Sequence, residues 1–178
     1  GVGGALLDNN GGAATPTDYS DDTVVNGTLG FGATVGTLTL VSIKDRGALP
    51  LLATDDVTYL GVALDDFAGD LVGLESVLEF HAYGVDAVLN KVSSGVLVIP
   101  AADKLDWSTF TSTGLDLSAA QAALNGTTLG ALTDSVDLAI DGSVVLNVLS
   151  GVLVAKGDFT IALGQVQSAL LPSGVSAD

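Results

Sequence analysis

The sequence predicts an all-β protein of long antiparallel strands, in a sandwich or an elongated superhelical sheet, with one short helix near residues 116–125. Two observations carry this prediction. Val, Leu and Ile alternate with polar or small residues in several runs, and a period of two places every second side chain on one face of a strand. Glu75 and Glu79 are the only glutamates among 21 acidic residues, and scarce Glu is typical of a chain with little helix.

The clearest alternation lies in residues 136–166, where three successive runs, VDLAIDG, SVVLNVL and DFTIALG, repeat the same pattern. Each run predicts a half-buried strand of an antiparallel sheet. Asp141-Gly142 and Ser150-Gly151 have the composition of turns, so we expect the chain to reverse at both places. Residues 156–158, Lys-Gly-Asp, are predicted to form a turn or a bulge.

The first half of the chain carries the same signal. Strands are predicted over 23–43, with a hairpin at Asn26-Gly27, and over 56–63, where the following Asp65-Asp66 is either a loop or a bulged continuation. Residues 71–92 are predicted to be one long bent strand, because the apolar alternation changes parity at Gly84, as it does at a β-bulge. A short strand is expected at 96–99.

Two features are expected between these strands and the 136–166 segment. Trp107 is predicted to anchor the connection 101–114 to the core. The run LDLSAAQAALN predicts the helix, with Asp116 or Ser118 at its N-terminus and Asn125-Gly126 as its stop.

The predicted organisation is a single domain. Residues 1–22, rich in Gly, Asn and Asp, are expected to be a loop-like N-terminal segment. Residues 23–172 form the β-rich domain, and 173–178 are a linker-like tail.

Composition excludes several classes of function. The 178-residue chain is 48% hydrophobic with a mean hydropathy of +0.56, but no apolar run reaches the roughly 18 to 20 residues of a membrane-spanning helix. Five basic residues against 21 acidic ones give a net charge of −16, which argues against nucleic acid and anionic membrane surfaces as partners. There is no Cys, which excludes a disulfide framework and a thiolate metal site. The excess of Asp, Thr and Gly with few Lys favours a saline or calcium-containing exterior.

Clusters of aspartates in the predicted loops are better candidates for a binding site than the single histidine. Calcium takes carboxylate and carbonyl oxygens, and a divalent cation relieves the repulsion of crowded carboxylates, so Asp18, Asp21 and Asp22 are where a calcium ion is first expected. The alternative is that these are solvated turn aspartates, since no complete calcium-loop motif is present. No other cofactor is expected.

His81, the only histidine, is expected on one strand face with Glu79 and Tyr83. Such a face offers acid–base groups, but a solvated polar strand face is the favoured interpretation. The glycines of GFGATVG lack the strand-to-helix context of a dinucleotide site.

Three segments together, VLEFHAYGVDAVLNKVSSG, KLDWSTF and VDLAIDGSVVLNVLSGVLVAKGDFTIALGQV, resemble a repeat module of giant secreted bacterial adhesin-like and surface proteins. The resemblance covers about residues 26–166 and rests on strand and turn residues. It implies an extracellular, multi-copy, non-enzymatic structural role in a cell-surface or filament assembly, with self-association between identical copies through strand edges. The alternative is a binding protein whose long strands form an apolar groove for lipid or another hydrophobic ligand.

Overall fold

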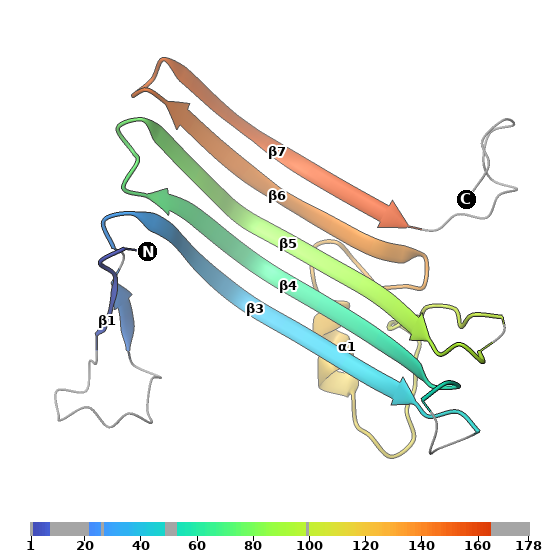
Figure 1. Cartoon of the computed structure of the whole chain (residues 1–178). Helices are drawn as coiled ribbons and strands as arrows, with labels where there is room; N and C mark the ends of the chain where they lie inside the picture. The colour runs from blue at the N-terminus through green and yellow to red at the C-terminus, as the bar shows by residue number, and fades with distance from the viewer. Residues whose placement is uncertain (1, 8–21, 26, 49–52, 99, 165–178) are drawn as a thin grey trace, which may run out of the picture. The chain divides into compact units, whose positions relative to one another are not determined.

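The computed structural model describes residues 2–7, 22–25, 27–48, 53–98 and 100–164 (Figure 1). The all-β class with long antiparallel strands and one short helix is confirmed. The elements are β1 (Ala5–Leu7), β2 (Thr23–Val25), β3 (Gly30–Asp45), β4 (Val57–Val72), β5 (Leu78–Ser94), α1 (Ser118–Leu124), β6 (Val136–Val148) and β7 (Leu153–Gly164).

The five long strands form one sheet in the order β3-β4-β5-β6-β7, so that each strand pairs with its neighbour in sequence. β1 and β2 form a separate antiparallel pair, with Ala5 opposite Val25. The chain divides into two compact units, and every strand of the five-stranded sheet contributes residues to both. Unit 1 comprises 1–34, 68–83 and 143–157, and unit 2 comprises 35–67, 84–142 and 158–178.

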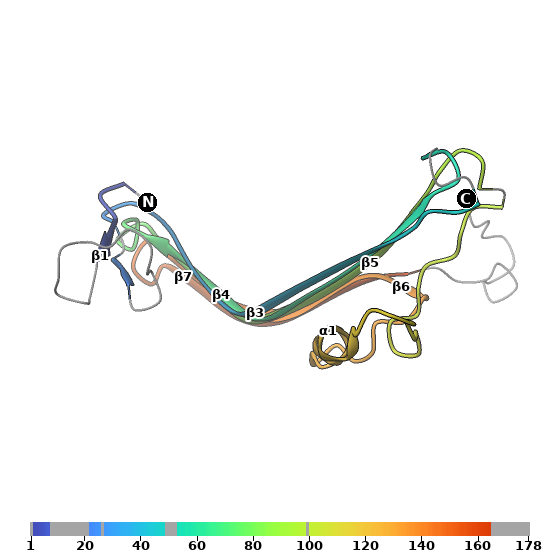
Figure 2. The same ribbon diagram turned by 90° about the horizontal axis from the view of Figure 1, so that it is seen from below.

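The core of unit 2 lies between one face of its strands and the connection from β5 to β6, which carries α1 (Figure 2). Trp107, Leu124 and Leu132 of this connection are fully buried. They form one cluster with the strand residues Val41, Ala63 and Val88. The prediction that Trp107 anchors the connection is therefore confirmed. Gly61 of β4 makes room for the indole, because a Cβ at this position would lie 2.8 Å from Trp107 Cε2.

A buried asparagine on β5 fixes this connection to the sheet. The Asn90 side chain, 2% exposed, donates from Nδ2 to the carbonyl oxygens of Leu105 and Thr133, both at 2.8 Å. Its Oδ1 accepts a hydrogen bond from Trp107 Nε1 at 3.1 Å. Every polar atom of the amide and the indole N–H thus has a partner inside the protein, which removes the cost of burying them.

The predicted helix is present but shorter than 116–125. Asp116 lies outside it, and its Oδ1 accepts hydrogen bonds from the backbone N–H of Ser118 at 3.0 Å and from the Ser118 hydroxyl at 2.7 Å. Asn125 follows the last helical residue and donates from Nδ2 to the carbonyl oxygen of Gln121.

Two bulges match the sequence patterns. The Asp65-Asp66 stretch is a bulged continuation of β4, since Asp66 has φ of 54° within the strand. Gly84 has φ of 56° within β5, at the place where the apolar alternation changes parity. The turn at Ser150-Gly151 is confirmed between β6 and β7, with φ of 51° and 103° at these residues.

Two local predictions are wrong and a third is narrowed. β6 runs without a turn through Asp141-Gly142. β7 runs through residues 156–158, which excludes the turn there and leaves the bulge as a prediction. The described residues 96–98 form a turn in place of the strand expected at 96–99. β1 lies within the segment predicted to be loop, whereas most of residues 1–22, the Asn26 of the predicted hairpin and the tail 173–178 lie outside the described residues.

Gly142 shows why its turn prediction failed. A Cβ there would lie 2.8 Å from Val85 Cγ2 on β5 and 3.2 Å from Phe159 Cζ on β7. The glycine is needed for the close approach of two neighbouring side chains within the sheet, not for a reversal of the chain.

In the part of the chain that the structure describes, α1 is the one helix, and it has neither the length nor the hydropathy to cross a membrane.

We expect Asn90→Leu to lower the free energy of unfolding by about 3 kcal/mol, because it leaves the Trp107 N–H and two carbonyl oxygens buried without partners. Urea unfolding followed by Trp107 fluorescence measures the change. Lys91→Ala, at the exposed next position, is the control and should change stability by less than about 0.5 kcal/mol. Equal stability of Asn90→Leu and the wild-type protein would contradict the anchoring role.

Two strand glycines should respond in opposite ways to alanine. Gly142→Ala should destabilise the protein by about 1–3 kcal/mol, because the new methyl group meets Val85 and Phe159. Gly157→Ala should be neutral or stabilise by up to about 1 kcal/mol, since a Cβ on Gly157 meets nothing within 4 Å and glycine weakens a strand interior. Thermal unfolding of both variants gives the comparison, and a destabilisation by Gly157→Ala as large as that by Gly142→Ala would contradict it.

Candidate functional site

The predicted calcium ligands fall largely outside the described residues. Asp18 and Asp21 are not among them, whereas Asp22 is described, is partly buried and directly precedes β2. Among the described residues no group of three or more His, Cys, Asp or Glu side chains has the arrangement of a metal site. The calcium site at Asp18, Asp21 and Asp22 therefore stays a prediction.

The predicted polar face of β5 is present in unit 1, where two of its three residues pair with adjacent strands and the third contacts β7, two strands away. His81 Nδ1 lies 2.6 Å from Asp70 Oδ1 on β4. Glu79 Oε2 accepts a hydrogen bond of 2.8 Å from Asn147 Nδ2 on β6. Lys156 Nζ on β7 lies 5.8 Å from the centre of the Tyr83 ring.

The His81–Asp70 and Glu79–Asn147 contacts are cross-strand pairs of the kind that stabilise sheets, each worth about 0.2–1 kcal/mol. The His81 and Asp70 side chains are 46% and 53% exposed, so the pair is solvated. The arrangement matches the favoured interpretation of a solvated polar strand face.

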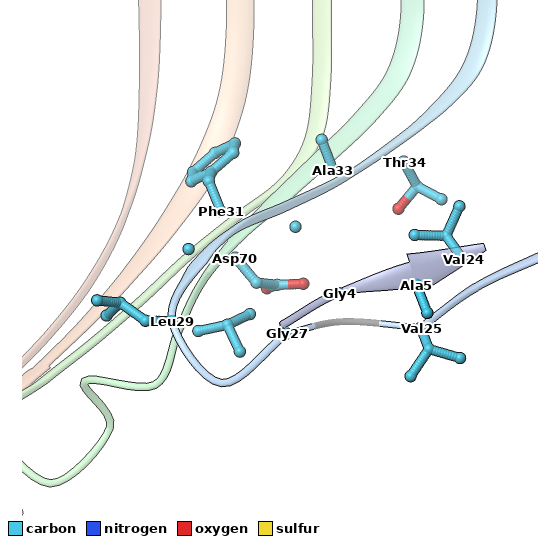
Figure 3. A pocket seen from close by; sticks show the side chains of 13 residues that line it. Gly4, Ala5, Val24, Val25, Gly27, Leu29, Phe31, Ala33, Thr34 and Asp70 are labelled. Carbon is cyan, nitrogen blue, oxygen red and sulfur yellow. The ribbon is translucent and has the colours of Figure 1, made fainter. Parts of the chain in front are cut away.

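A pocket of about 680 Å³ in unit 1 lies beside this pair, between the β1–β2 sheet and the start of β3 (Figure 3). Its lining is mostly Gly, Ala and Val, with Leu29 and Phe31 as the largest apolar side chains. Asp70 is the one charged residue of the lining, and Figure 3 shows its side chain in the space between β3 and β1. The surface of this pocket is more polar than apolar despite these side chains, and its one carboxylate is already paired with His81.

Two carboxyl groups meet in unit 2, where sequence reasoning singled out only loop aspartates. Asp86 of β5 is 5% exposed and hydrogen-bonds with Asp65 of β4. Asp86 Oδ1 accepts a bond of 2.9 Å from the N–H of the bulge residue Asp66, and Asp86 Oδ2 accepts a short bond from the Thr128 hydroxyl. The bulge thus turns a backbone donor toward the buried carboxylate.

The two acids have opposite pKa shifts. Burial, followed by the charge of Asp86, raises the pKa of Asp65 above its usual range. Burial also acts to raise the pKa of Asp86, but the hydrogen bonds from the Asp66 N–H, the Thr128 hydroxyl and Asp65 together lower it. Asp65 is therefore the member that holds a proton more readily, and Asp86 the member that stays ionised.

The sheet ends on both sides in a long strand, β3 of 16 residues and β7 of 12 residues. No described strand pairs with the outer side of either one. Residues 30–43 of β3 and 159–164 of β7 contain no charged residue and no proline. β7 is exposed at every residue except Phe159. These two stretches thus lack the charges and prolines that commonly prevent edge-to-edge pairing, whereas Lys44 and Asp45 end β3 and Lys156 and Asp158 lie in the first half of β7.

A second surface is one face of the unit 2 strands. Val41, Ala63 and Val88 point into the core beside Trp107, so residues one position away along each strand point to the opposite face. The same face continues on β6 and β7. A Cβ on Gly142 would meet the side chains of Val85 and Phe159, so Gly142 and Phe159 lie on the same face of the sheet as Val85. We call this surface the open face. It consists of Leu38, Leu40, Leu60, Val62, Leu64, Val85, Ala87, Leu89, Leu138, Ile140, Phe159, Ile161 and Leu163.

The open face is apolar and incompletely covered. α1 lies on the other side of these strands (Figure 2), and no described helix or strand of unit 2 covers the open face. Leu38 and Leu40 are 63% and 64% exposed, and Ile161 and Leu163 are 45% and 56% exposed. The alternation in the sequence indicated one apolar face for each strand, but not that the helix would cover the other face.

Comparison of the chain with protein-family models, with curated proteins and with solved structures gives no match.

The Asp65–Asp86 pair predicts a pH-dependent effect of Asp65→Asn. The raised pKa of Asp65 means that its ionisation disfavours the folded state, so this penalty grows as pH rises above 3.8 through the folded-state pKa. We expect Asp65→Asn to be more stable than the wild-type protein at pH 7, and the difference to vanish below pH 3.8, where Asp65 is protonated in both states. Urea unfolding at the two pH values measures it.

The exposed Asp103→Asn is the matched control and should have little effect at either pH. If Asp65→Asn proves less stable than the wild-type protein at pH 7, the interpretation of the pair is wrong.

Proposed function

We propose that the chain is a non-enzymatic structural module that associates with identical copies through the edges of its sheet, as a unit of an extracellular bacterial surface or filament assembly. The observation that carries the proposal is the pair of long edge strands, β3 and β7, with their uncharged stretches 30–43 and 159–164.

The chemistry of an edge strand supports this role. Alternate residues of an edge strand direct their backbone N–H and C=O groups away from the sheet, where a strand of another molecule pairs with them. A partner strand on β3 forms a ladder as long as the strands of the sheet itself. When a strand is added to a sheet edge in this way, main-chain hydrogen bonds supply the affinity. The two ends of the sheet are different strands, so β7 of one copy on β3 of the next is a heterologous contact, which extends into an open filament where the rotation between copies does not close a ring.

The composition of the chain fits an extracellular location. The net charge of −16 keeps copies apart at surfaces where no pairing occurs, and so favours ordered association over precipitation. The absence of Cys from the whole chain is compatible with an oxidising exterior.

A second candidate function is the binding of lipid or another apolar ligand. Leu29 and Phe31, which are 43% and 56% exposed beside the pocket of about 680 Å³ in unit 1, favour it. Native mass spectrometry separates the two candidates, because a ligand-binding protein retains extra mass after purification.

Edge association is tested with two adjacent proline substitutions in β7, Ile161→Pro and Ala162→Pro. Because N–H groups alternate in direction along an edge strand, one substitution removes an outward donor and the other removes a bond within the sheet. We expect electron microscopy of the wild-type chain to show elongated assemblies. The proline variant that keeps the wild-type unfolding temperature should shorten or abolish them.

The other proline variant unfolds at lower temperature and serves as the control for damage to the sheet. Particles of a single, non-extending size in the wild-type preparation would contradict the proposal, as would assemblies that persist in the proline variant of unchanged stability.

A further inference from the structure

We propose that the open face of unit 2 is the contact surface for a second copy of this chain, and that two copies pack face to face as a two-sheet sandwich. This inference goes beyond edge association, because it uses the face of the sheet and closes after two copies. It does not require the edges to be occupied.

The face has the composition of a buried surface. A sheet with one apolar face is stable when another layer covers that face, and the helix-bearing connection covers only the opposite side in unit 2. The face is exposed on β3 and β7 and partly buried along the three strands between them, and contiguous apolar patches that reach solvent in this way mark interaction sites. The leucines that remain most exposed, Leu38 and Leu40, belong to this patch.

The charges of unit 2 are distributed so that two copies can approach. Asp65, Asp137 and Asp141 lie on the α1 side of their strands, as does Asp86. The alternation along β3 and β5 places Lys44 and Lys91 on the open face, near the ends of these strands, and Lys44 is paired with Asp56 at 2.6 Å. Asp66, at the bulge, is the one strand aspartate at the margin of the open face. A centre without acids and a polar margin are typical of protein–protein interfaces.

The area of the open face suits a dimer. Five strands about 4.8 Å apart span about 24 Å, and about nine residues per strand span about 30 Å, which gives about 700 Å². A specific interface of standard size buries about 800 Å² on each partner. A broad sheet face is matched by another sheet of the same twist, because two sheets pack about 10 Å apart with their inner side chains interdigitated.

The first test measures the mass of the full chain by sedimentation velocity across a wide range of concentration. We expect a dimer that Leu40→Lys and Ile161→Lys weaken at least about tenfold, because each substitution places two charges in the symmetric interface. Val35→Lys is the matched control. Val35 is also exposed, at 48%, but the alternation along β3 directs its side chain to the same face as Val41, which is the face toward α1. This substitution should leave the dimer unchanged.

The second test uses the absence of Cys in the chain. Ala87→Cys places a single thiol near the centre of the open face, where a cross-linker that spans about 10 Å should join two copies. Val35→Cys should not form this product. Where Ala162→Pro is the proline variant of unchanged stability, it should still dimerise, because Ala162 alternates to the other side of β7 and is not part of the open face, so that loss of edge association is distinguished from loss of the face contact.

Three results would overturn the inference: a wild-type chain that is monomeric at every concentration, a dimer that Leu40→Lys and Ile161→Lys leave intact, or equal cross-linking of Ala87→Cys and Val35→Cys. Native mass spectrometry that finds a monomer carrying lipid mass would instead assign the face to an apolar ligand.

Discussion

The buried contact between Asn90 and Trp107 is the interaction on which the organisation of unit 2 depends. The β5-to-β6 connection must cross one face of the sheet, and its backbone carbonyls and indole N–H must lose water when they do so. One asparagine side chain supplies partners for Trp107, Leu105 and Thr133, three points along that connection. The aliphatic core around Trp107 then excludes water. The hydrogen bonds of the Asn90 amide hold the β5-to-β6 connection against one face of the strands.

This anchoring decides which surfaces remain available. Once the connection covers the face that bears Val41, Ala63 and Val88, the opposite apolar face has no described element of unit 2 over it. The edges are a separate matter, since they follow from a sheet in which sequence neighbours pair and β3 and β7 come last on either side. The proposed edge and face contacts therefore arise from different physical features, backbone groups at the edge and aliphatic side chains on the face.

The polar groups within the strands are used for structure in the described part of the chain. His81 pairs with Asp70, Glu79 with Asn147, and the Asp65–Asp86 pair accepts donors from the β4 bulge and Thr128. The sequence predicted the shared face of Glu79, His81 and Tyr83, because alternation within one strand fixes it. It did not reveal the meeting of Asp65 and Asp86, since they belong to different strands and only the pairing of β4 with β5 brings them together.

The sequence by itself determined the all-β class, the long strands, the single helix, the bulge at Gly84 and the burial of Trp107, because alternation, helix-favouring composition and aromatic burial are local signals. It left the Asp65-Asp66 stretch open between a loop and a bulged strand. Only the tertiary structure decided that β6 continues through Gly142, that residues 96–98 turn, and which sheet face the connection covers. A glycine required for a turn and one required for close packing are identical in sequence. They differ only in their neighbours, here Val85 and Phe159 from adjacent strands.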